Sequence, residues 1–247
     1  MSMRRTSWLE WIAQGLGPAA HNRRSSSRRR AKRLTLECLE RRSMLTTITV
    51  IGSDDGPGVF NPTDNTDTTL RGALGHIRAS GDTIQFQDTG WVIHLQSPLS
   101  IGNSVTIFGS DDTGTGKVTI DGGNKVRDFV IGRDARVTLD SLNIINGFAA
   151  GGAGVRNEFG TLLVVDCTFS GNSSTGVDGG GAILNQAGKT LITGSAFENN
   201  KSSDDGGAIA NKLGSVALSE TKFLNNTASD KGGAINNQAG RLSRSHP

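Results

Sequence analysis

Three short signatures recur at a fixed interval along the C-terminal half of this 247-residue chain. Each unit begins with Gly-Gly-Ala-Ile, continues with an Asn two residues after the Ile and a Gly three residues after that Asn, and then reaches Phe-x-x-Asn. The units that begin at Gly180, Gly206 and Gly232 are 26 residues apart, and a weaker copy begins at Gly152. A fixed period of this size is typical of a solenoid, in which each repeat buries its apolar face only against its neighbours.

The apolar residues within each unit alternate, as expected of β-strands. Counting back from Phe197, Ile192 and Thr190 stand at −5 and −7, and the small residue Ser195 stands at −2. The alternation slips by one residue between −5 and −2, which predicts a bend from one strand into the next. A further strand is predicted at Ala-Ile-x-Asn. Three short strands in each turn of 26 residues predict an all-β fold, a right-handed parallel β-helix, with successive coils about 4.8 Å apart.

Residues at equivalent positions of successive coils should stack into columns. The Phe side chains should form a column in the core, and the Asn side chains should form amide ladders along the turns, each donating to one neighbour and accepting from the other. The Gly pairs should form tight corners, which need a positive φ angle or a close approach of the backbone. The predicted structural residues are Phe169, Phe197 and Phe223; Asn172, Asn200 and Asn226; Asn157, Asn185, Asn211 and Asn237; and Gly180, Gly181, Gly206, Gly207, Gly232 and Gly233.

The first 45 residues differ in composition from the rest of the chain. They hold 11 Lys or Arg and 3 Asp or Glu, a net charge of +8, whereas the remaining residues hold 15 and 20, a net charge of −5. The Arg- and Ser-rich block at 23–33 should be solvated and disordered. A nucleic-acid-binding arm is the alternative, but the acidic remainder has no matching excess of positive charge, so no nucleic-acid partner is expected. No run approaches the ~20 apolar residues that a membrane-spanning helix needs.

Two segments before the repeats resemble motifs of secreted bacterial proteins. Residues 36–45 resemble the LEPR-xLL motif, with Arg41 at the usual Pro position. Residues 68–86 look like the CSLREA-type segment that opens many bacterial β-helix proteins, and Leu70, Leu74 and Ile77 would form the apolar stripe of a short capping helix. We therefore expect a basic disordered leader at 1–45, an N-terminal cap at 46–90, and a β-helix at 91–247 that is regular from residue 152 and has an incomplete last coil.

Gly-Gly-Ala-Ile alternating with Phe-x-x-Asn resembles the polymorphic outer membrane protein repeat of chlamydial adhesins, which also occurs in secreted proteins of other bacteria. The resemblance covers residues 152–237. It implies a non-enzymatic β-helical protein that is extracellular or associated with the outer membrane at the cell surface. The implied roles are adhesion, display or extracellular structure, and the implied partners are an extracellular polysaccharide or another cell surface.

A carbohydrate-active β-helix, either a polysaccharide lyase or hydrolase or a sugar-binding module, is the alternative. Such enzymes need clustered carboxylates with a basic residue, often with Ca²⁺. The candidate groups are Asp111 with Asp112, Asp121 with Arg127 and Asp128, and Asp204 with Asp205. Each lies in a Gly-rich turn, where Asp is favoured for structural reasons. We expect no catalytic residue, no metal ligand and no cofactor, Ca²⁺ being the one ion that the acidic turns could take. A groove lined by two carboxylates and one Arg or Lys from adjacent coils would favour the enzyme.

The remaining reactive residues are predicted to be structural. His21, His76, His94 and His246 are scattered without the spacing of metal ligands. Cys167 stands at the small-residue position of its unit, so we expect a buried thiol, and no disulfide with Cys38.

Overall fold

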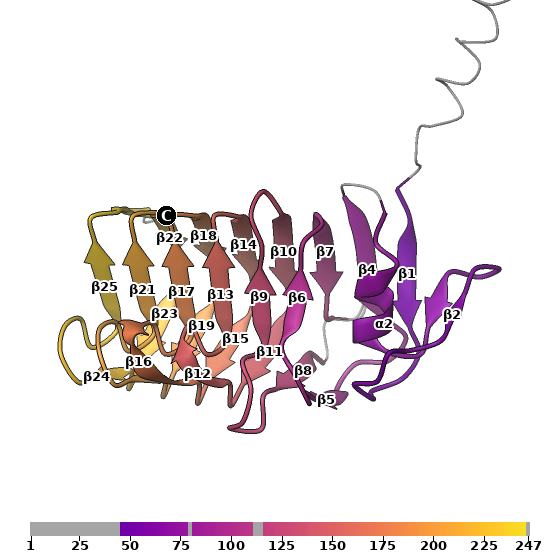
Figure 1. The fold of residues 1–247 in the computed structure, drawn as a ribbon, viewed down its shortest axis with the longest axis horizontal. Coiled ribbons are helices and arrows are strands. Elements are labelled where there is room, and N and C mark those ends of the chain that lie inside the picture. Colours follow the sequence, from indigo (N-terminus) through magenta and orange to yellow (C-terminus); the bar gives the residue numbers. More distant parts are fainter. Residues whose placement is uncertain (1–44, 79–80, 111–115, 246–247) are drawn as a thin grey trace, which may run out of the picture. The chain divides into compact units, whose positions relative to one another are not determined.

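The structure is a computed structural model that describes residues 45–78, 81–110 and 116–245. The predicted leader at 1–45 lies outside the described residues except for Leu45. The strands form a ten-stranded sheet, two six-stranded sheets and a four-stranded sheet (Figure 1). From β4 (Asp82–Phe86) to β25 (Ile235–Gln238), each coil contributes one strand to each of the three larger sheets, which makes six successive coils. This arrangement confirms the predicted all-β parallel β-helix.

The three larger sheets take their strands in sequence order along the solenoid. From β1 onward, sheet 1 contains β1 (Thr47–Val50), β4, β7 (Val105–Phe108), β10 (Arg136–Asp140), β14 (Thr161–Val165), β18 (Lys189–Thr193), β22 (Ser215–Ser219) and β26 (Arg241–Ser245). Sheet 2 contains β5 (Val92–His94), β8 (Val118–Asp121), β11 (Leu142–Ile145), β15 (Thr168–Ser170), β19 (Ala196–Glu198) and β23 (Lys222–Leu224). Sheet 3 contains β6 (Leu99–Ile101), β9 (Phe129–Ile131), β13 (Val155–Glu158), β17 (Ile183–Gln186), β21 (Ile209–Lys212) and β25.

The strands pair in the register that the repeat predicts. In sheet 1, inward residues alternate with outward ones, so Leu162 and Val164 of β14 are buried while their neighbours are only partly covered. The slip in the alternation falls where Asp166, and the equivalent Gly194 and Glu220 of the next coils, take positive φ angles of 47°, 61° and 49°. These left-handed residues turn the chain from sheet 1 into sheet 2.

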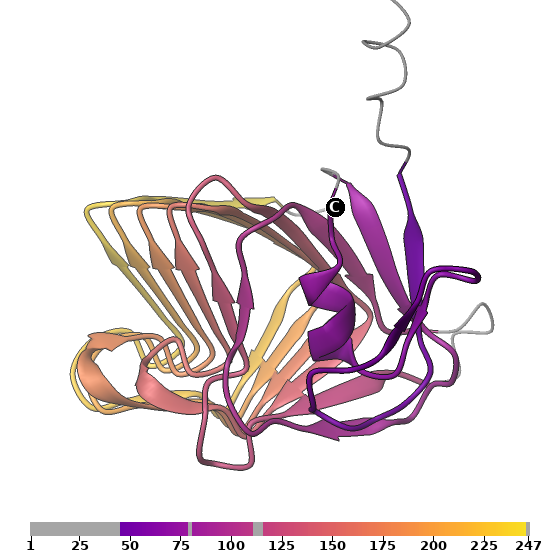
Figure 2. The ribbon, with the colours of Figure 1, turned by 45° about the vertical axis from the view of Figure 1, so that its right-hand side comes forward.

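One helix, α2 (Leu70–Gly75), is present in the described part of the chain, and it lies against β1, β3 (Thr66–Asp67) and β4 (Figure 2). The Oγ1 of Thr69 caps it by accepting a hydrogen bond from the Gly72 N–H at 2.9 Å. Leu70 and Ala73 of the helix are buried in the core, as is Ile77 just after it, so this segment covers apolar surface at this end of the solenoid. Sheet 1 ends here in β3 and an antiparallel β2 (Phe60–Asn61), which cover the edge of β1.

A fourth sheet was missing from the three-strand prediction. It contains β12 (Phe148–Gly151), β16 (Ser173–Gly179), β20 (Lys201–Ser202) and β24 (Thr227–Ala228). These strands follow the Phe-x-x-Asn position and are rich in Ser, Thr and Gly, a composition that indicates a loop. They become strands because parallel pairing with the neighbouring coil, such as Ser173 with Lys201, supplies their backbone hydrogen bonds.

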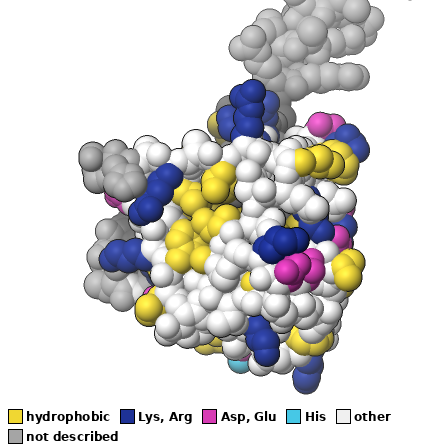
Figure 3. Space-filling view, turned by 90° about the vertical axis from the view of Figure 1, so that its left-hand side faces the viewer, with side chains coloured by type: hydrophobic (Ala, Val, Ile, Leu, Met, Phe, Trp, Pro, Cys, Tyr) yellow, Lys and Arg dark blue, Asp and Glu magenta, His cyan; other side chains and the backbone are white. Residues whose placement is uncertain are grey.

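At the opposite end from α2, apolar side chains gather on the face formed by the last coil (Figure 3). Leu218, Phe223 and Ile235 line a hollow of about 490 Å³ there. Phe223 and Ile235 are therefore only partly buried, whereas the equivalent residues of interior coils are fully buried.

Candidate functional site

The Phe and Asn columns lie inside the solenoid and hold the coils together. The ring centroids of Phe169 and Phe197 are 4.8 Å apart and those of Phe197 and Phe223 are 5.1 Å apart, with nearly parallel planes. The Nδ2 of Asn172 donates to the Oδ1 of Asn200 at 3.0 Å, and the Nδ2 of Asn200 donates to the next Asn of the column at 2.9 Å. These groups satisfy one another, so the columns stabilise the fold and offer little to a ligand.

A second amide ladder follows the corner between sheets 3 and 1. Its Nδ2-to-Oδ1 distances are 2.9 Å from Asn157 to Asn185, 2.7 Å from Asn185 to Asn211, and 2.6 Å from Asn211 to Asn237. At the corner where the chain enters sheet 3, the first Gly of each Gly-Gly pair takes a positive φ, which is 61° at Gly206. A Cβ on the Gly that follows would clash with the backbone carbonyl of the next coil, as at Gly207.

The structure does not assemble Asp121, Arg127 and Asp128 into an open site. Asp128 is completely buried, and neither of its carboxylate oxygens has a hydrogen-bond partner. Burial, and secondarily the charge of Asp121, raise the pKa of Asp128 well above its ordinary value. Asp121 lies 2.9 Å from the Nδ1 of His94, while Arg127 donates to two backbone carbonyls. Asp111 and Asp112 lie outside the described residues.

The acidic turn at Asp204 and Asp205 gains a third carboxylate from the next coil. The oxygens of Asp204, Asp205 and Asp230 lie within 4.8 Å of one another, but Asp205 also accepts a hydrogen bond from the Lys231 N–H. Ca²⁺ takes six to eight oxygen ligands, so these three groups are an incomplete donor set. Asp230 occupies the same turn position as Asp204 one repeat later, and the backbone N–H of Asp230 donates to the carbonyl of Asp204, so the stacking of the two coils brings the carboxylates together.

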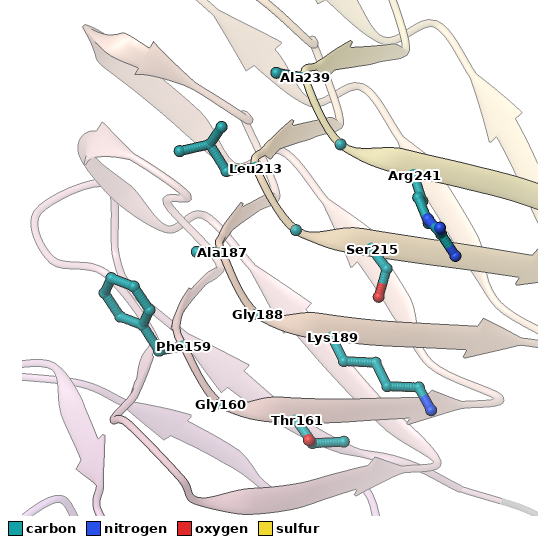
Figure 4. Close-up of a pocket in the computed structure, with 12 residues that line it drawn as sticks. Phe159, Gly160, Thr161, Ala187, Gly188, Lys189, Leu213, Ser215, Ala239 and Arg241 are labelled. Carbon is teal, nitrogen blue, oxygen red and sulfur yellow. The ribbon is translucent and has the colours of Figure 1, made fainter.

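An open groove of about 560 Å³ runs across four coils at the corner between sheets 3 and 1 (Figure 4). Its floor consists of the Gly that follows each ladder Asn, such as Gly188 and Gly214. A Cβ at Gly188 would clash with the amide of Asn157, and one at Gly214 would clash with that of Asn185. The groove is therefore a consequence of the ladder, because the amides directly beneath the floor allow no side chain above them.

Two rows of side chains border this floor (Figure 4). One row precedes the glycines and contains Phe159, Ala187, Leu213 and Ala239; the other follows them and contains Thr161, Lys189, Ser215 and Arg241. No carboxylate lines the groove. It therefore lacks the pair of acids that glycoside hydrolysis requires, and the predicted signature of a carbohydrate-active enzyme is not met here.

The first row contains two strained, exposed apolar residues. Phe159 and Leu213 have φ angles of 62° and 64°, in a region where bulky side chains are uncommon. Their side chains are nevertheless 44% and 71% exposed, and the guanidinium carbon of Arg133 lies 4.1 Å from the centroid of the Phe159 ring. Ala187 and Ala239 take φ angles of 54° and 56° at the same position, so the left-handed conformation belongs to the corner, and what distinguishes Phe159 and Leu213 is their exposed apolar side chains. Sequence analysis missed this row, although its residues directly precede the regularly spaced Gly that follows each ladder Asn.

Comparison with known proteins identifies the repeats. Residues 166–186, 194–212 and 220–238 match the family model described as the Chlamydia polymorphic membrane protein (Chlamydia_PMP) repeat. The chain therefore contains three copies of this repeat on a β-helix, as the Gly-Gly-Ala-Ile and Phe-x-x-Asn spacing predicted. Searches of curated proteins and of solved structures found no match. In the described part of the chain, no helix is long and apolar enough to cross a bilayer.

Proposed function

We infer that this chain is a non-enzymatic surface module that presents its outer face and corner groove to molecules outside the cell. The repeats indicate a surface or outer-membrane protein. The observation that supports an adhesive or display role is the groove, which combines apolar, hydroxyl and cationic side chains without any carboxylate. Such a groove can bind a ligand, but it contains no acid–base pair that could carry out hydrolysis or elimination.

The architecture favours this role because it separates stability from recognition. Buried residues of each strand form the ladders, while the alternate residues face solvent and can differ from coil to coil. Within β18, for example, Thr190 and Ile192 are buried, whereas Lys189 and Leu191 are exposed. A large ligand-facing surface can therefore be supported by a short repeated sequence.

Cell fractionation combined with surface labelling tests the location. The protein should be labelled on intact cells by an impermeant amine reagent and should be digested by added protease. Recovery only from the cytosol would contradict the proposal.

Incubation with acidic and neutral polysaccharides tests the absence of catalysis. We expect no new reducing ends and no unsaturated products. Turnover that is lost in the Asp121→Ala variant would show that the enzymatic alternative is correct.

A further inference from the structure

Basic side chains recur in every second coil along one edge of sheet 1. The pairing register places Arg136 opposite Thr161, Thr161 opposite Lys189, Lys189 opposite Ser215, and Ser215 opposite Arg241. The column continues in the other direction to Ser104, whose Oγ accepts a hydrogen bond from the N–H of Arg136. Hydroxyl and cationic residues therefore alternate over six coils. We call this row the alternating column.

The spacing of these cations follows from the fold. Adjacent parallel strands lie about 4.8 Å apart, so cations two coils apart are separated by about 9.6 Å. Arg136, Lys189 and Arg241 thus define a line of three charges spaced over about 19 Å. Because these residues stand on a hydrogen-bonded sheet, the spacing of their Cα atoms is set before any ligand arrives.

The three cations are available to an external anion. All three are exposed, and none of them makes an ion pair among the described residues. The next outward position of the same strands holds uncharged residues, namely Thr138, Leu163, Leu191, Ala217 and Ser243. The positive charge of this line contrasts with the net charge of −5 on residues 46–247. Neither the column nor this next outward position holds a carboxylate in these coils, and the nearby acid is Asp134, in the turn before Arg136.

The apolar row of the groove has the same two-coil period. Phe159 and Leu213 share coils with the hydroxyl residues Thr161 and Ser215, whereas the small Ala187 and Ala239 share coils with Lys189 and Arg241 (Figure 4). In the coil of Arg136 the equivalent residue is Asp134. Over the four coils of the groove, each pair of coils therefore offers one apolar and hydroxyl contact, followed by one cation beside a small residue. A linear polymer that alternates a neutral unit with an anionic unit would complement this pattern.

We propose that the corner groove and the alternating column bind an acidic polysaccharide whose anionic group recurs on every second sugar, with the polymer running along the solenoid axis. The cations bind the carboxylate or sulfate groups. The exposed side chain of Leu213, and the face of the Phe159 ring that Arg133 does not cover, pack against the neutral sugars. The proposal rests on the surface location inferred above, because polymers of this kind lie outside cells. A nucleic acid fits less well, since duplex phosphates follow one another at about 3.4 Å along each strand.

Binding by the full chain to four probes tests the ligand class. Hyaluronan carries a carboxylate on every second sugar, keratan sulfate carries sulfate without carboxylate, chitin oligosaccharide is neutral, and oligo(dT) is a nucleic acid. At physiological salt we expect binding of hyaluronan, keratan sulfate or both, and the preferred one identifies the anion. Stronger binding of the neutral oligosaccharide than of both acidic glycans would overturn the proposal.

Two variants test the spacing rather than the total charge. Lys189→Gln should weaken glycan binding by up to about fivefold, the range of one exposed ion pair. The double variant Lys189→Ser/Ser215→Lys keeps the net charge, composition and surface but moves one cation by one coil. It should weaken binding as much as Lys189→Gln does. Unchanged affinity in the double variant would show that only bulk charge matters and would refute the proposed register.

Matched controls separate the groove from the basic leader, which is present in every variant. Lys222→Gln removes an exposed Lys from sheet 2 and should leave affinity unchanged. Bound glycan should also protect Lys189, but not Lys222, from an amine-modifying reagent. Phe159→Ala should weaken glycan binding and leave oligo(dT) binding unchanged. Equal losses for the two polymers would instead indicate general polyanion binding. A protein that is labelled on the cell surface but fails these tests would refute the ligand while retaining the proposed location.

Discussion

Removal of the central ring of the Phe column should destabilise the solenoid strongly. The side chain of Phe197 is completely buried and has stacked rings on both sides, at 4.8 and 5.1 Å. Truncation of a buried Phe to Ala typically costs about 3–5 kcal/mol, and each stacked ring pair contributes roughly 0.5–1.5 kcal/mol of that figure. Because the truncation abolishes the stacking on both faces, we expect Phe197→Ala to lower the free energy of unfolding by about 4 kcal/mol.

Phe223→Ala provides the comparison within the same column. This ring has one stacked neighbour and is only partly buried at the open end of the core, so its loss should cost about half as much, roughly 2 kcal/mol. Urea denaturation should give both values, and thermal melts should show a shift of about 8–16 °C for Phe197→Ala, at 2–4 °C per kcal/mol. Leu224→Ala, at an exposed neighbouring position, should be almost neutral. Equal effects at the two Phe positions would refute the argument that stacking on both faces sets the cost.

Three further changes test the interior. Asn200→Ala should leave several buried groups unpaired, each costing about 1–3 kcal/mol, and should destabilise the protein in urea much more than Asn237→Ala at the exposed end of the other ladder. Because the pKa of Asp128 is raised in the folded state, its contribution to stability is complete below the unfolded pKa of about 3.9 and is lost as the pH rises toward the folded pKa. The difference in the free energy of unfolding between Asp128→Asn and the wild type should therefore shift in favour of the variant between pH 4 and pH 7. An equal difference at both pH values would contradict the raised pKa of Asp128. Burial raises the pKa of the Cys167 thiol to about 12, so native protein should leave Cys167 unmodified by iodoacetamide at pH 8, and rapid modification found by peptide mapping would indicate local opening.

The fold could be predicted from the sequence because the repeat constrains both register and direction. Equal offsets between Phe169, Phe197 and Phe223 are sufficient to align them, since parallel strands connected by loops of equal length cannot shift without moving every inward side chain to the outer face. The strands of the fourth sheet carried no comparable signal. Ser173–Gly179 has neither apolar alternation nor strong β propensity, and its strand conformation depends on pairing with the neighbouring coils.

The candidate site was less predictable because its members are separated in sequence and differ in type. Lys189 and Arg241 stand two units apart, and the unit between them has Ser215 at the same position. A net charge averaged over the body hides such a line. Asp230, by contrast, follows directly from the repeat, because it is the residue equivalent to Asp204 in the next coil. The line of cations requires the register between coils, and that register is predicted from the inward residues, whereas the site consists of outward ones.

The position of the groove shows how a structural ladder can determine a recognition surface. The amides of Asn157 and Asn185 lie so close beneath Gly188 and Gly214 that no side chain fits above them, which leaves the corner hollow through every regular coil. The ladder thus fixes the depth and direction of the groove, while the residues on either side of each Gly remain free to set its chemistry. Exchanging Lys189 with Ser215 should accordingly alter binding while leaving the ladder and the thermal stability unchanged, because both side chains project outward from the same sheet. Ligand specificity in this chain would then depend on the order of the coils as much as on their composition.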